Sequence, residues 1–459
     1  MSGPTLTQLR RTTDYPALGE QMHALIRELI PWCRSITGDG LRRTLAALAR
    51  VAPMQVHEVP SGTAILDWVV PKEWAIRDAW VANARGERVI DFQQSNLHVV
   101  SYSVPVRTRM PLSQLRAHLH TLPEQPDWIP YRTSYYAEDW GFCLPHRQLE
   151  QLPEGDYEVV IDSTLENGSL SYGELLLPGD DPREVLFSAH ACHPSLANDN
   201  LSGLVVAAYL AQALAAVPRR LSYRFIFVPG TIGSITWLSR NRDAAARIHA
   251  GLVVAGVGDP GPLSYKKSRA GDAEIDRAVV HALRSSGQPH QVIDFSPYGY
   301  DERQYCSPGF NLPVGSLTRT PHGQYPEYHT SADDCAFVRP ESLAGSLRIY
   351  LDVVDILEGN RRCLNTRPEG EPQLGRRGLY RFMGGLADPG AASMAMLWVL
   401  NLSDGSSTLL DIAERSKLGF DAIRDAADAL AAHGLLEIPT QAVDPRLLRF
   451  RSAQGAARR

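Results

Sequence analysis

Apolar residues recur at helical spacing in the first fifty residues of the chain. Between Met22 and Ile30 the apolar residues are spaced three or four positions apart, and this spacing predicts an amphipathic helix. A second helical run begins near Leu41, after the turn Thr37-Gly38-Asp39-Gly40. The pattern therefore predicts that residues 1–60 form the helical N-terminal part of a larger domain.

The pattern changes after residue 60 to short alternating segments such as NLHVVSYSV, separated by Pro, Gly and polar clusters. Alternation with a period of two indicates strands, so we predict an inserted β-rich domain over residues 61–155. This region is also rich in aromatic residues, which we expect mainly to pack and stiffen the domain: Trp68, Trp74, Trp80, Trp128, Tyr131, Tyr135, Tyr136 and Trp140.

Buried strands alternate with helices after residue 180. VLFSAHA, YRFIFVP and GLVVAGVG are continuous apolar runs, and each is followed by a segment with a helical pattern. This order predicts an α/β domain over residues 156–362, with a largely parallel sheet covered by helices on both faces. Ligand sites in such sheets lie at the carboxyl ends of the strands.

A chain of 459 residues is too long for one hydrophobic core, and its last part differs in pattern. Residues 363–390, rich in Arg, Gly and Pro, are interpreted as a linker. SMAMLWVLNL, TLLDIAERS and FDAIRDAADALAAHGLL then predict three short helices, with LEIP and LLRFRS as candidates for a paired wing. We interpret residues 391–459 as a winged helix-turn-helix.

The charge balance argues against a nucleic-acid partner. The chain has 46 Lys and Arg against 51 Asp and Glu, a net charge of -5. Residues 391–439 hold seven acidic and three basic residues, whereas a DNA reader needs a basic face. We expect the winged helix to pack against the rest of the protein or to join copies of the chain into a homo-oligomer.

We expect the chain to be cytoplasmic and to have no membrane partner. Its N-terminus lacks the apolar core of a signal peptide, and no uncharged apolar run reaches membrane-spanning length. The six cysteines show no CxxC spacing, so reduced and mostly buried thiols are expected.

Residues able to hold a metal ion stand at the ends of two predicted strands and in one later loop. His190 closes VLFSAHA, with His193 and Asp199 shortly after it, and Asp259 closes GLVVAGVGD. His329 lies in a polar loop before another helix. Imidazole nitrogens and carboxylate oxygens are ligands that zinc accepts. For any one of these residues taken alone, a hydrogen-bonded loop residue is the better interpretation; their combination is what suggests a metal site.

The segments HACHPSLANDNLSG, PGTIGSITWLSRN, YDERQYCSPG and YPEYHTSADD, in this order, resemble those of the co-catalytic zinc aminopeptidases. That group contains bacterial leucyl aminopeptidase and glutamate carboxypeptidase. Within it, the chain is similar to a bacterial aminopeptidase-like branch with an inserted β domain and a C-terminal winged helix. The resemblance covers nearly the whole chain and implies a zinc-exopeptidase fold, with a mixed, largely parallel sheet flanked by helices.

The resemblance also implies roles for particular residues. By position, His190 matches the first histidine ligand of one metal, and Asp199 matches the aspartate that bridges two metals. Asp259 falls near the place of the second carboxylate on the first metal. His329 matches the histidine that closes the second site.

Three positions depart from the family pattern. The di-zinc enzymes carry two adjacent glutamates, a general base and a metal ligand, where this chain has Gly230 and Thr231. Cys192 replaces the aspartate that orients the first histidine, and His193 is a candidate to enter the site instead. Because a hydroxyl is a poor zinc ligand, we expect about one zinc per chain rather than two.

Because Gly230 stands where the family has its general-base glutamate, another acidic residue must act as the base. The candidates in the motif segments are Asp301, Glu302 and Glu327. For Asp301 and Glu302, a salt bridge with Arg303 is an equally good interpretation. Tyr325 and Tyr328, beside His329, are candidates for a substrate pocket, with sealing of a domain contact as the alternative.

These features predict a zinc-dependent aminopeptidase-like hydrolase of an amide bond in a small peptide-like or aminoacyl-conjugated molecule. The alternative is a catalytically silent relative that binds a small molecule or a protein partner with the same pocket. A transcription regulator is the weakest of the three hypotheses, because the winged helix is acidic.

Overall fold

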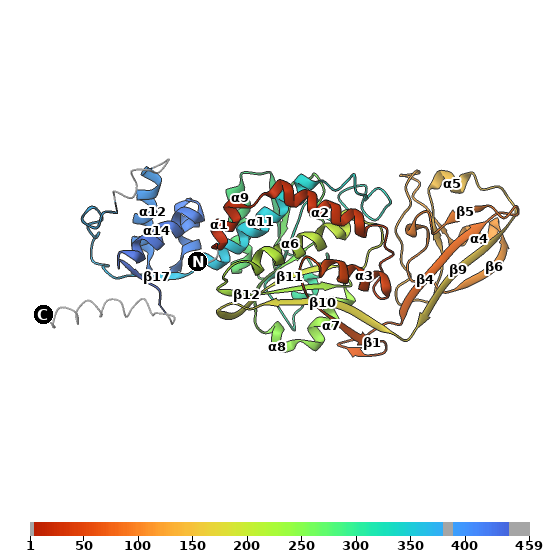
Figure 1. The fold of residues 1–459 in the computed structure, drawn as a ribbon, viewed down its shortest axis with the longest axis horizontal. Coiled ribbons are helices and arrows are strands. Elements are labelled where there is room, and N and C mark those ends of the chain that lie inside the picture. The colour runs from red at the N-terminus through yellow and green to blue at the C-terminus, as the bar shows by residue number, and fades with distance from the viewer. Residues whose placement is uncertain (1–3, 380–388, 440–459) are drawn as a thin grey trace. The chain divides into compact units, whose positions relative to one another are not determined.

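The computed structural model describes residues 4–379 and 389–439. Within these residues the chain forms two compact units, coloured by residue number in Figure 1. The first takes in the chain up to Asp276 together with Gln288–Leu351. The second takes in Arg277–Gly287 and the chain from Asp352 onward.

A mixed sheet of eight strands forms the centre of the first unit (Figure 1). Its strands are β1 (Gln55–Pro60), β10 (Ser169–Leu177), β11 (Asp181–His190), β12 (Leu221–Val228), β13 (Ile248–Val254), β14 (Leu263–Lys266), β15 (His290–Ile293) and β16 (Val314–Thr318). They lie in the order β1-β10-β12-β11-β13-β16-β14-β15. The central strands β12, β11, β13 and β16 are parallel, while β1 and β10 run antiparallel at one edge. The predicted α/β fold with a largely parallel sheet is confirmed.

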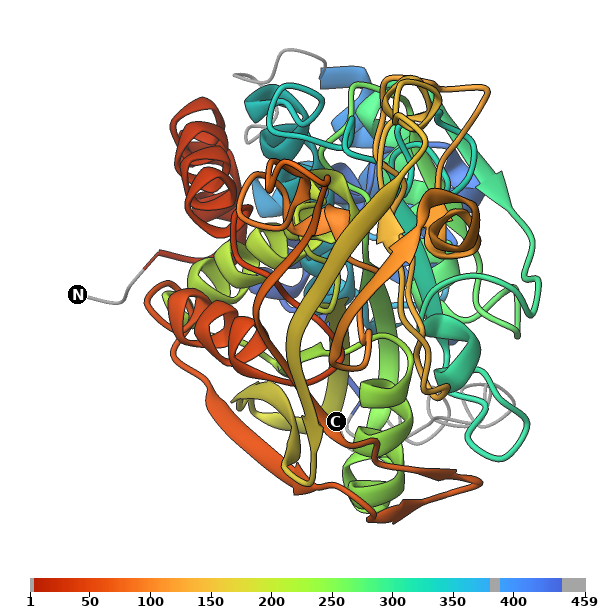
Figure 2. The ribbon, with the colours of Figure 1, turned by 90° about the vertical axis from the view of Figure 1, so that its right-hand side faces the viewer.

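Helices cover both faces of this sheet (Figure 2). On one face, α6 (Gly203–Ala215) packs across β11, β12 and β13, with α2 (Tyr15–Leu29) and α3 (Asp39–Leu48) beside it. On the other, α7 (Ile232–Arg240) contacts β10 and β12. Because α6 is apolar on nearly every side, it is buried almost throughout. The remaining helices are α1 (Leu6–Thr12), α8 (Arg242–Ala245) and α10 (Glu302–Tyr305). The chain of α9 (Glu274–Ser286) and that of α11 (Pro340–Gly359) are each divided between the two units.

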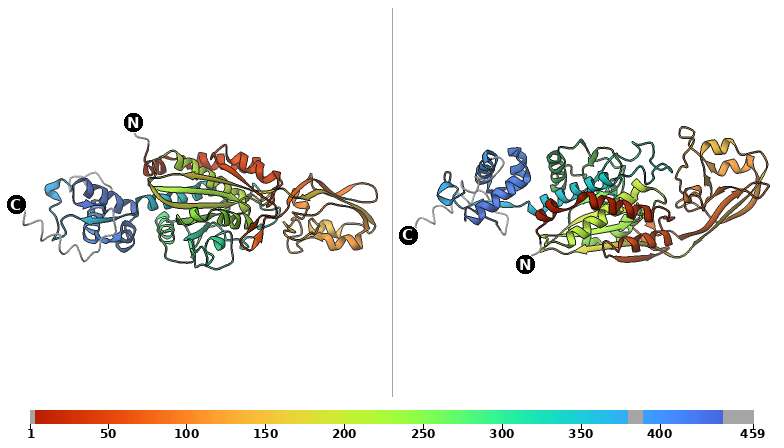
Figure 3. Two further views of the ribbon diagram at one scale, coloured as in Figure 1. Left: turned by 90° about the horizontal axis from the view of Figure 1, so that it is seen from below. Right: turned by 45° about the horizontal axis from the view of Figure 1, so that its top comes forward.

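The inserted segment forms a separate antiparallel sheet at one end of the first unit (Figure 3). Its strands are β4 (Glu73–Ala82), β5 (Arg88–Asp91), β6 (Val106–Pro111) and β9 (Asp156–Glu166), in the order β5-β4-β9-β6. β9 begins just after the boundary at residue 155 and pairs with β4 along its length, so this sheet extends into residues that we assigned to the α/β domain. The smaller elements are β2 (Ala64–Ile65), β3 (Trp68–Val69), β7 (Leu119–His120), β8 (Phe142–Cys143), α4 (Leu112–Leu115), α5 (His146–Glu150), η1 (Asn96–His98) and η2 (Arg116–His118).

One hydrophobic cluster joins the inserted sheet to the large one. It contains Trp74 and Tyr157 from the insertion and Leu186 and Trp237 from the α/β part, all buried. Not every aromatic side chain of the insertion packs inside, since Tyr136 is 54% exposed. Packing therefore explains Trp74 but leaves part of the aromatic surface open.

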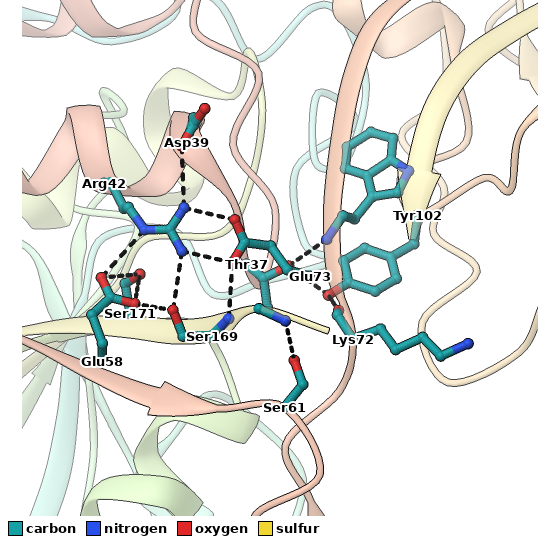
Figure 4. A network of polar contacts seen from close by, with 12 residues as sticks. Thr37, Asp39, Arg42, Glu58, Ser61, Lys72, Glu73, Tyr102, Ser169 and Ser171 are labelled. Atoms are coloured by element: carbon teal, nitrogen blue, oxygen red, sulfur yellow. Dashed lines mark hydrogen bonds and ion pairs between the residues drawn. The ribbon is translucent and has the colours of Figure 1, made fainter. Parts of the chain in front are cut away.

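A polar network holds the base of the insertion (Figure 4). Arg42 of α3 donates from Nη1 and Nη2 to the two carboxylate oxygens of Glu73, each at 2.7 Å. Its Nε donates to Glu58 of β1 at 3.2 Å. The backbone N–H of Ser169 also donates to Glu73, at 2.8 Å. Since Glu73 begins β4 and Ser169 begins β10, the network ties the points where the chain enters and leaves the insertion to α3.

Besides its parts of α9 and α11, the described residues of the second unit contain three helices and a small sheet. The helices are α12 (Pro389–Leu402), α13 (Leu409–Ser416) and α14 (Phe420–Ala432), and the strands β17 (Arg362–Asn365), β18 (Asp404–Thr408) and β19 (Leu436–Glu437), with a short turn η4 (Gly375–Arg377). β17 lies largely in the segment that we interpreted as a linker, yet it pairs with both β18 and β19. LEIP supplies β19, while LLRFRS lies outside the described residues.

The only basic side chain of α14 is engaged within the second unit. Arg424 is buried and donates from Nη1 to Asp355 at 2.7 Å and from Nη2 to Asp421 at 2.9 Å. Its charge is therefore compensated by neighbouring carboxylates, as expected of a packing element rather than of a helix that contacts phosphates.

Two further features concern the described residues as a whole. Among them, no helix combines the length and the apolar character that a bilayer span requires. The six cysteines are all free thiols, and four of them, Cys143, Cys192, Cys306 and Cys363, are buried. Their side chains are thus mainly packing groups.

Candidate metal centre

The candidate site lies at the carboxyl edge of the large sheet. His190 is the last residue of β11, and Asp199 lies in the irregular turn η3 (Ala197–Ser202) that leads into α6. Nε2 of His190 donates to Oδ1 of Asp199 at 2.8 Å. Nε2 of His329 donates to Oδ2 of the same carboxylate at 3.0 Å. The structure thus brings His329, from a distant part of the chain, to the same carboxylate as His190.

His193 completes a ring of imidazoles around this carboxylate. Its ring centroid lies 4.9 Å from that of His190 and 5.2 Å from that of His329. One ligand atom from each of His190, His193 and Asp199 can be chosen so that all lie within 4.8 Å of one another. These three residues are the group best placed to share one ion.

Burial and mutual contact control the protonation of the cluster. Burial lowers the pKa of His193 to about 3, which keeps its imidazole neutral and its lone pair available to a metal. Burial would lower the pKa of His190, but the hydrogen bond to Asp199 and the charges of the nearby carboxylates together outweigh it and raise this pKa. Burial would raise the pKa of Asp199, yet the surrounding histidines hold it well below its usual range.

The donor set fits zinc. Structural and catalytic zinc sites use imidazole and carboxylate donors at roughly 2.0–2.1 Å, which places two ligands of a tetrahedral ion about 3.3 Å apart. The two nitrogen–oxygen separations around Asp199, 2.8 and 3.0 Å, are close to that spacing. Small adjustments of the side chains would therefore suffice to admit the ion.

The structure does not place Asp259 in this cluster. Its Oδ1 accepts hydrogen bonds from Thr320 Oγ1 at 2.6 Å and from the Gly261 N–H at 2.8 Å. Its Oδ2 accepts one from Asn198 Nδ2 at 3.2 Å. Asp259 comes five residues after β13 ends at Val254, so the chain has already left the strand edge where ligands gather. Asp259 supports the loop before Asp199 instead of facing the histidines.

The insertion positions His329. The N–H of Tyr131 donates to the carbonyl of His329 at 2.8 Å, and Pro130 forms a β-bridge with Thr330. His329 has a φ of 56°, in the left-handed region that residues other than glycine rarely adopt. The Tyr131 ring also lies 5.1 Å from that of His329 and 5.2 Å from that of His193. Tyr131 was noted in the sequence only as one of many aromatic residues.

Asp333 fixes the turn that carries Asp199. Its Oδ1 accepts the N–H of Asn198 at 2.6 Å, and its Oδ2 accepts the N–H of Asp199 at 3.0 Å. Burial raises the pKa of Asp333 to about 8. Sequence reasoning included Asp333 in a motif but gave it no role, because a side chain that binds backbone groups leaves no pattern of its own.

Asp301 lies beside Gly230, close to His190. It is buried, and its Oδ1 accepts a hydrogen bond from Ser234 at 3.0 Å, while its Oδ2 has no partner among the described residues. A Cβ added to Gly230 would lie 3.1 Å from the His190 Cβ and 3.8 Å from Asp301 Oδ1. Burial raises the pKa of Asp301 to about 6.

The other two predicted acids are placed differently. One interpretation of the sequence expected a salt bridge between Glu302 and Arg303. Glu302 does form a salt bridge, but its partner is Lys266, whose Nζ lies 2.7 Å from Oε1. Glu327 is partly exposed, and its backbone carbonyl accepts hydrogen bonds from Thr330. Of the three acids, Asp301 is the one whose carboxylate lies beside Gly230, where the resemblance expects the base.

Aromatic rings line the site around the histidines. Tyr328 stacks on His329 with ring centroids 4.0 Å apart, as its position beside that histidine suggested. Tyr325 is buried and stacks on Phe337, so it belongs to the packing of the loop. Tyr300, which sequence reasoning missed although it precedes Asp301, stacks on His190 at 5.3 Å.

The fold defines the class of the protein. The zinc aminopeptidase of Bacillus subtilis superposes with a TM-score of 0.54 at 13% identity, over 73% of this chain and 94% of that one. At this identity the match shows the fold alone, which is an aminopeptidase fold with an additional winged helix. The family model described as winged helix-turn-helix matches residues 361–438 and so includes β17.

The chain belongs to the family described as "Domain of unknown function (DUF4910)", whose model matches residues 23–360. A Clostridium acetobutylicum protein is 51% identical over 420 residues, 92% of this chain and 96% of the relative. Its name is "Putative polysaccharide biosynthesis protein with aminopeptidase-like domain". A crystal structure of a "putative peptidase" from the same species has a TM-score of 0.89 at 49% identity, over 93% of this chain and 98% of that one.

Proposed function

We propose that this chain is a zinc-dependent hydrolase that cleaves an amide bond in a small peptide-like or aminoacyl-conjugated molecule. The observation that carries the proposal is the convergence of three histidines on the buried carboxylate of Asp199, at the carboxyl edge of the sheet. The aminopeptidase fold and the aminopeptidase-like domain named in the Clostridium acetobutylicum relative support the same reaction class.

In this proposal His190, His193 and Asp199 hold one zinc ion. When bound, zinc supplies Lewis acidity, which polarises a carbonyl group and makes water more acidic. His329 faces the other oxygen of Asp199, where the co-catalytic enzymes that the sequence resembles have a second metal. Gly230 and Thr231 offer no carboxylate there, so we propose about one zinc per chain.

Asp301 is proposed as the group that accepts the proton from the attacking water. Ser234 donates to Oδ1 and so orients the carboxylate, while Oδ2 remains available for a proton. A general base is most effective when its pKa lies near the working pH, and burial brings the pKa of Asp301 to about 6. At neutral pH most of this carboxylate is ionised and ready to accept.

A second function is kept because of Gly230. A glycine has no group that accepts a proton, so a chain that carries it where the resemblance expects the base is also suited to binding without turnover. In that case the same histidines and aromatic rings bind a small molecule or a partner protein. Both functions require a bound metal, but only the hydrolase turns a substrate over.

Metal binding is tested first. Zinc is removed with a chelator, and its return is followed by calorimetry and by metal analysis of the dialysed protein. His190→Ala should remove most of the bound zinc, because the remaining ligands form an incomplete shell. His433→Ala changes an exposed histidine of the second unit and serves as the matched control. Absence of zinc binding by the unmodified protein would refute the site.

Turnover is tested next, on a panel of aminoacyl amides and aminoacyl conjugates with zinc-loaded and zinc-free protein. Zinc-dependent release of an amino acid supports the hydrolase. Zinc binding without turnover of any member of the panel would favour the binding function instead.

A further inference from the structure

Arg34 is a buried cation whose side chain bonds the backbone of a candidate metal ligand. It lies between α2 and α3 and is 1% exposed. Its Nε donates to the carbonyl of His193 at 2.8 Å, and its Nη1 donates to the carbonyl of Leu29 at 2.6 Å. Burial lowers the pKa of Arg34 to about 10, so the guanidinium is still charged at neutral pH. Because burial of a charged group costs stability, an arginine buried beside a ligand is a candidate for a specific role.

The two carbonyl groups belong to separate segments, which Arg34 joins. Leu29 is the last residue of α2, and the last carbonyls of a helix lack α-helical partners. They also form the negative end of the helix dipole, which favours a cation. His193 lies in the loop that leads from β11 to the turn of Asp199. The planar guanidinium holds its donors in fixed directions, so one side chain fixes this loop against the end of α2.

A second contact holds the same loop two residues later. Oγ of Ser195 lies 2.6 Å from Oδ1 of Asn96 and 3.2 Å from the carbonyl oxygen of Ile30. Nδ2 of Asn96, which comes from the insertion, donates to the carbonyl of Pro31 at 3.2 Å. The backbone is thus held on both sides of Pro194. Of these contacts, the one from Arg34 is made to the ligand residue itself.

The imidazole of His193 is held differently from those of the other two histidines. They each hydrogen-bond an oxygen of Asp199, whereas the His193 ring makes no such bond. Within residues 4–379 and 389–439, its polar contact is a weak one, from Nδ1 to Sγ of Cys192 at 3.7 Å. A histidine that binds a metal usually has its second ring nitrogen fixed by a carboxylate, a carbonyl or water. The place of the His193 ring therefore depends strongly on its backbone, and so on Arg34.

We propose that Arg34 is a positioning residue, which acts through the carbonyl of His193 and holds the imidazole where it serves as a ligand of the metal ion. The inference rests on the proposed zinc site and deepens it, because it names the group that fixes the histidine absent from the family pattern. Arg34 itself does not bind the ion. Its replacement should therefore weaken zinc binding only where His193 is present.

The test is a double-mutant cycle that is read as zinc affinity. Zinc is titrated into the metal-free full chain at pH 7, by calorimetry in competition with a chelator. Arg34→Met keeps an apolar stem without donors and should weaken zinc binding by about 10–100-fold, as the loss of a contact that supports a ligand does. In the His193→Ala background the same change should alter the affinity by less than about two-fold. A merely structural role of Arg34 would instead weaken binding equally in both backgrounds.

Arg219→Met is the matched control. Arg219 precedes β12, at the end of that strand opposite the site, and it also donates to backbone carbonyl groups, those of Leu214, Val217 and Pro178. Its replacement removes a guanidinium of the same kind of contact and should leave the zinc affinity within about two-fold.

Arg34→Lys keeps the buried charge and makes the test independent of whether Arg34→Met folds. An ammonium is a point charge without the fork of the guanidinium, so it does not bond both carbonyls in the same geometry. We expect this variant to weaken zinc binding by at least about three-fold. We also expect the His193 ring to be displaced in its metal-free crystal structure.

Unchanged zinc affinity in the Arg34 variants, or an equal loss with and without His193, would overturn the inference. A metal-free structure of Arg34→Lys in which the His193 ring keeps its place would overturn it as well. That structure also decides the matter where His193→Ala binds zinc too weakly to be measured. Failure of the unmodified chain to bind zinc would overturn the metal site and this inference with it, whereas normal binding by the variants would overturn the role of Arg34 alone.

Discussion

Oδ1 of Asp301 lies 3.8 Å from the point where a side chain on Gly230 would begin. Val228, two residues before Gly230, lies opposite His190 in the parallel pair β11–β12. The register of these strands therefore brings Gly230 beside the first histidine, and α10 brings Asp301 to the same place from later in the chain. A carboxylate is thus present where position 230 has none.

The first prediction concerns turnover. Asp301→Asn keeps the size of the side chain and its ability to accept from Ser234, but an amide does not take up a proton at neutral pH. If Asp301 is the base, hydrolysis of the best substrate in the panel should fall by about 10²–10⁴-fold, the usual contribution of general acid–base catalysis. Asp294→Asn, a change of an exposed aspartate, is the matched control. An Asp301→Asn protein with full activity would show that Asp301 is not the base and would point to Glu327 instead.

The second prediction is that the same change stabilises the fold. Burial raises the pKa of Asp301 to about 6, whereas an aspartate in the unfolded chain has a pKa of about 3.9. The folded protein therefore binds this proton more tightly, and its stability falls as the pH rises from about 4 to about 6. Above that window the ionised group costs about 2–3 kcal/mol, at 1.36 kcal/mol per unit.

Asp301→Asn should remove that cost. In urea denaturation at pH 8, the variant should have the higher free energy of unfolding, and the difference should shrink toward pH 4. A variant that is less stable than the unmodified protein at pH 8 would contradict this account. Opposite effects on turnover and stability would mark Asp301 as a functional residue, because a purely structural carboxylate loses stability when it is replaced.

The sequence predicted that His190, at the end of a strand, and Asp199, in the loop after it, lie together, because ligand sites in parallel sheets gather at the carboxyl ends of the strands. In the structure the two side chains are 2.8 Å apart. Asp259 was misplaced, since counting along an apolar run does not show that the chain has left the strand before that residue. The contact of Tyr131 with His329 left no local pattern, because it joins segments almost two hundred residues apart.

Asp301 and Glu302 show a second limit of sequence reasoning. They are adjacent, and no feature of the sequence distinguishes their roles. At the start of α10 their side chains diverge, one toward Ser234 and Gly230, the other toward Lys266. The direction depends on how that short helix is set against the sheet, which only the tertiary structure determines.

The third prediction is the metal content. We expect about one zinc per chain after saturation and dialysis, because Asp199 faces a histidine on each oxygen but no carboxylate follows β12. Metal analysis combined with quantitative amino-acid analysis gives the ratio. A ratio of two would mean that another residue completes a second site, and a crystal structure with zinc would then identify it.

The fourth prediction concerns the base of the insertion. The hydrogen bonds from Arg42 lower the pKa of Glu73, so this pair stabilises the fold while Glu73 is ionised, and the effect is lost as the pH falls through the folded pKa. Arg42→Met keeps an apolar stem but removes the donors. It should reduce the free energy of unfolding at pH 7 by about 1.5–3 kcal/mol, the range for hydrogen bonds to a charged group.

The matched control is Arg77→Met. Arg77 also donates two hydrogen bonds to one carboxylate, that of Asp162, but its side chain is 73% exposed. Exposed pairs contribute little, so this variant should unfold like the unmodified protein. The loss of unfolding free energy in Arg42→Met should also become smaller below pH 4, because a protonated Glu73 no longer forms an ion pair with Arg42 in the unmodified protein. Equal stability losses in both variants, or a deficit independent of pH, would show that the network at the base of the insertion does not act through the charge of Glu73.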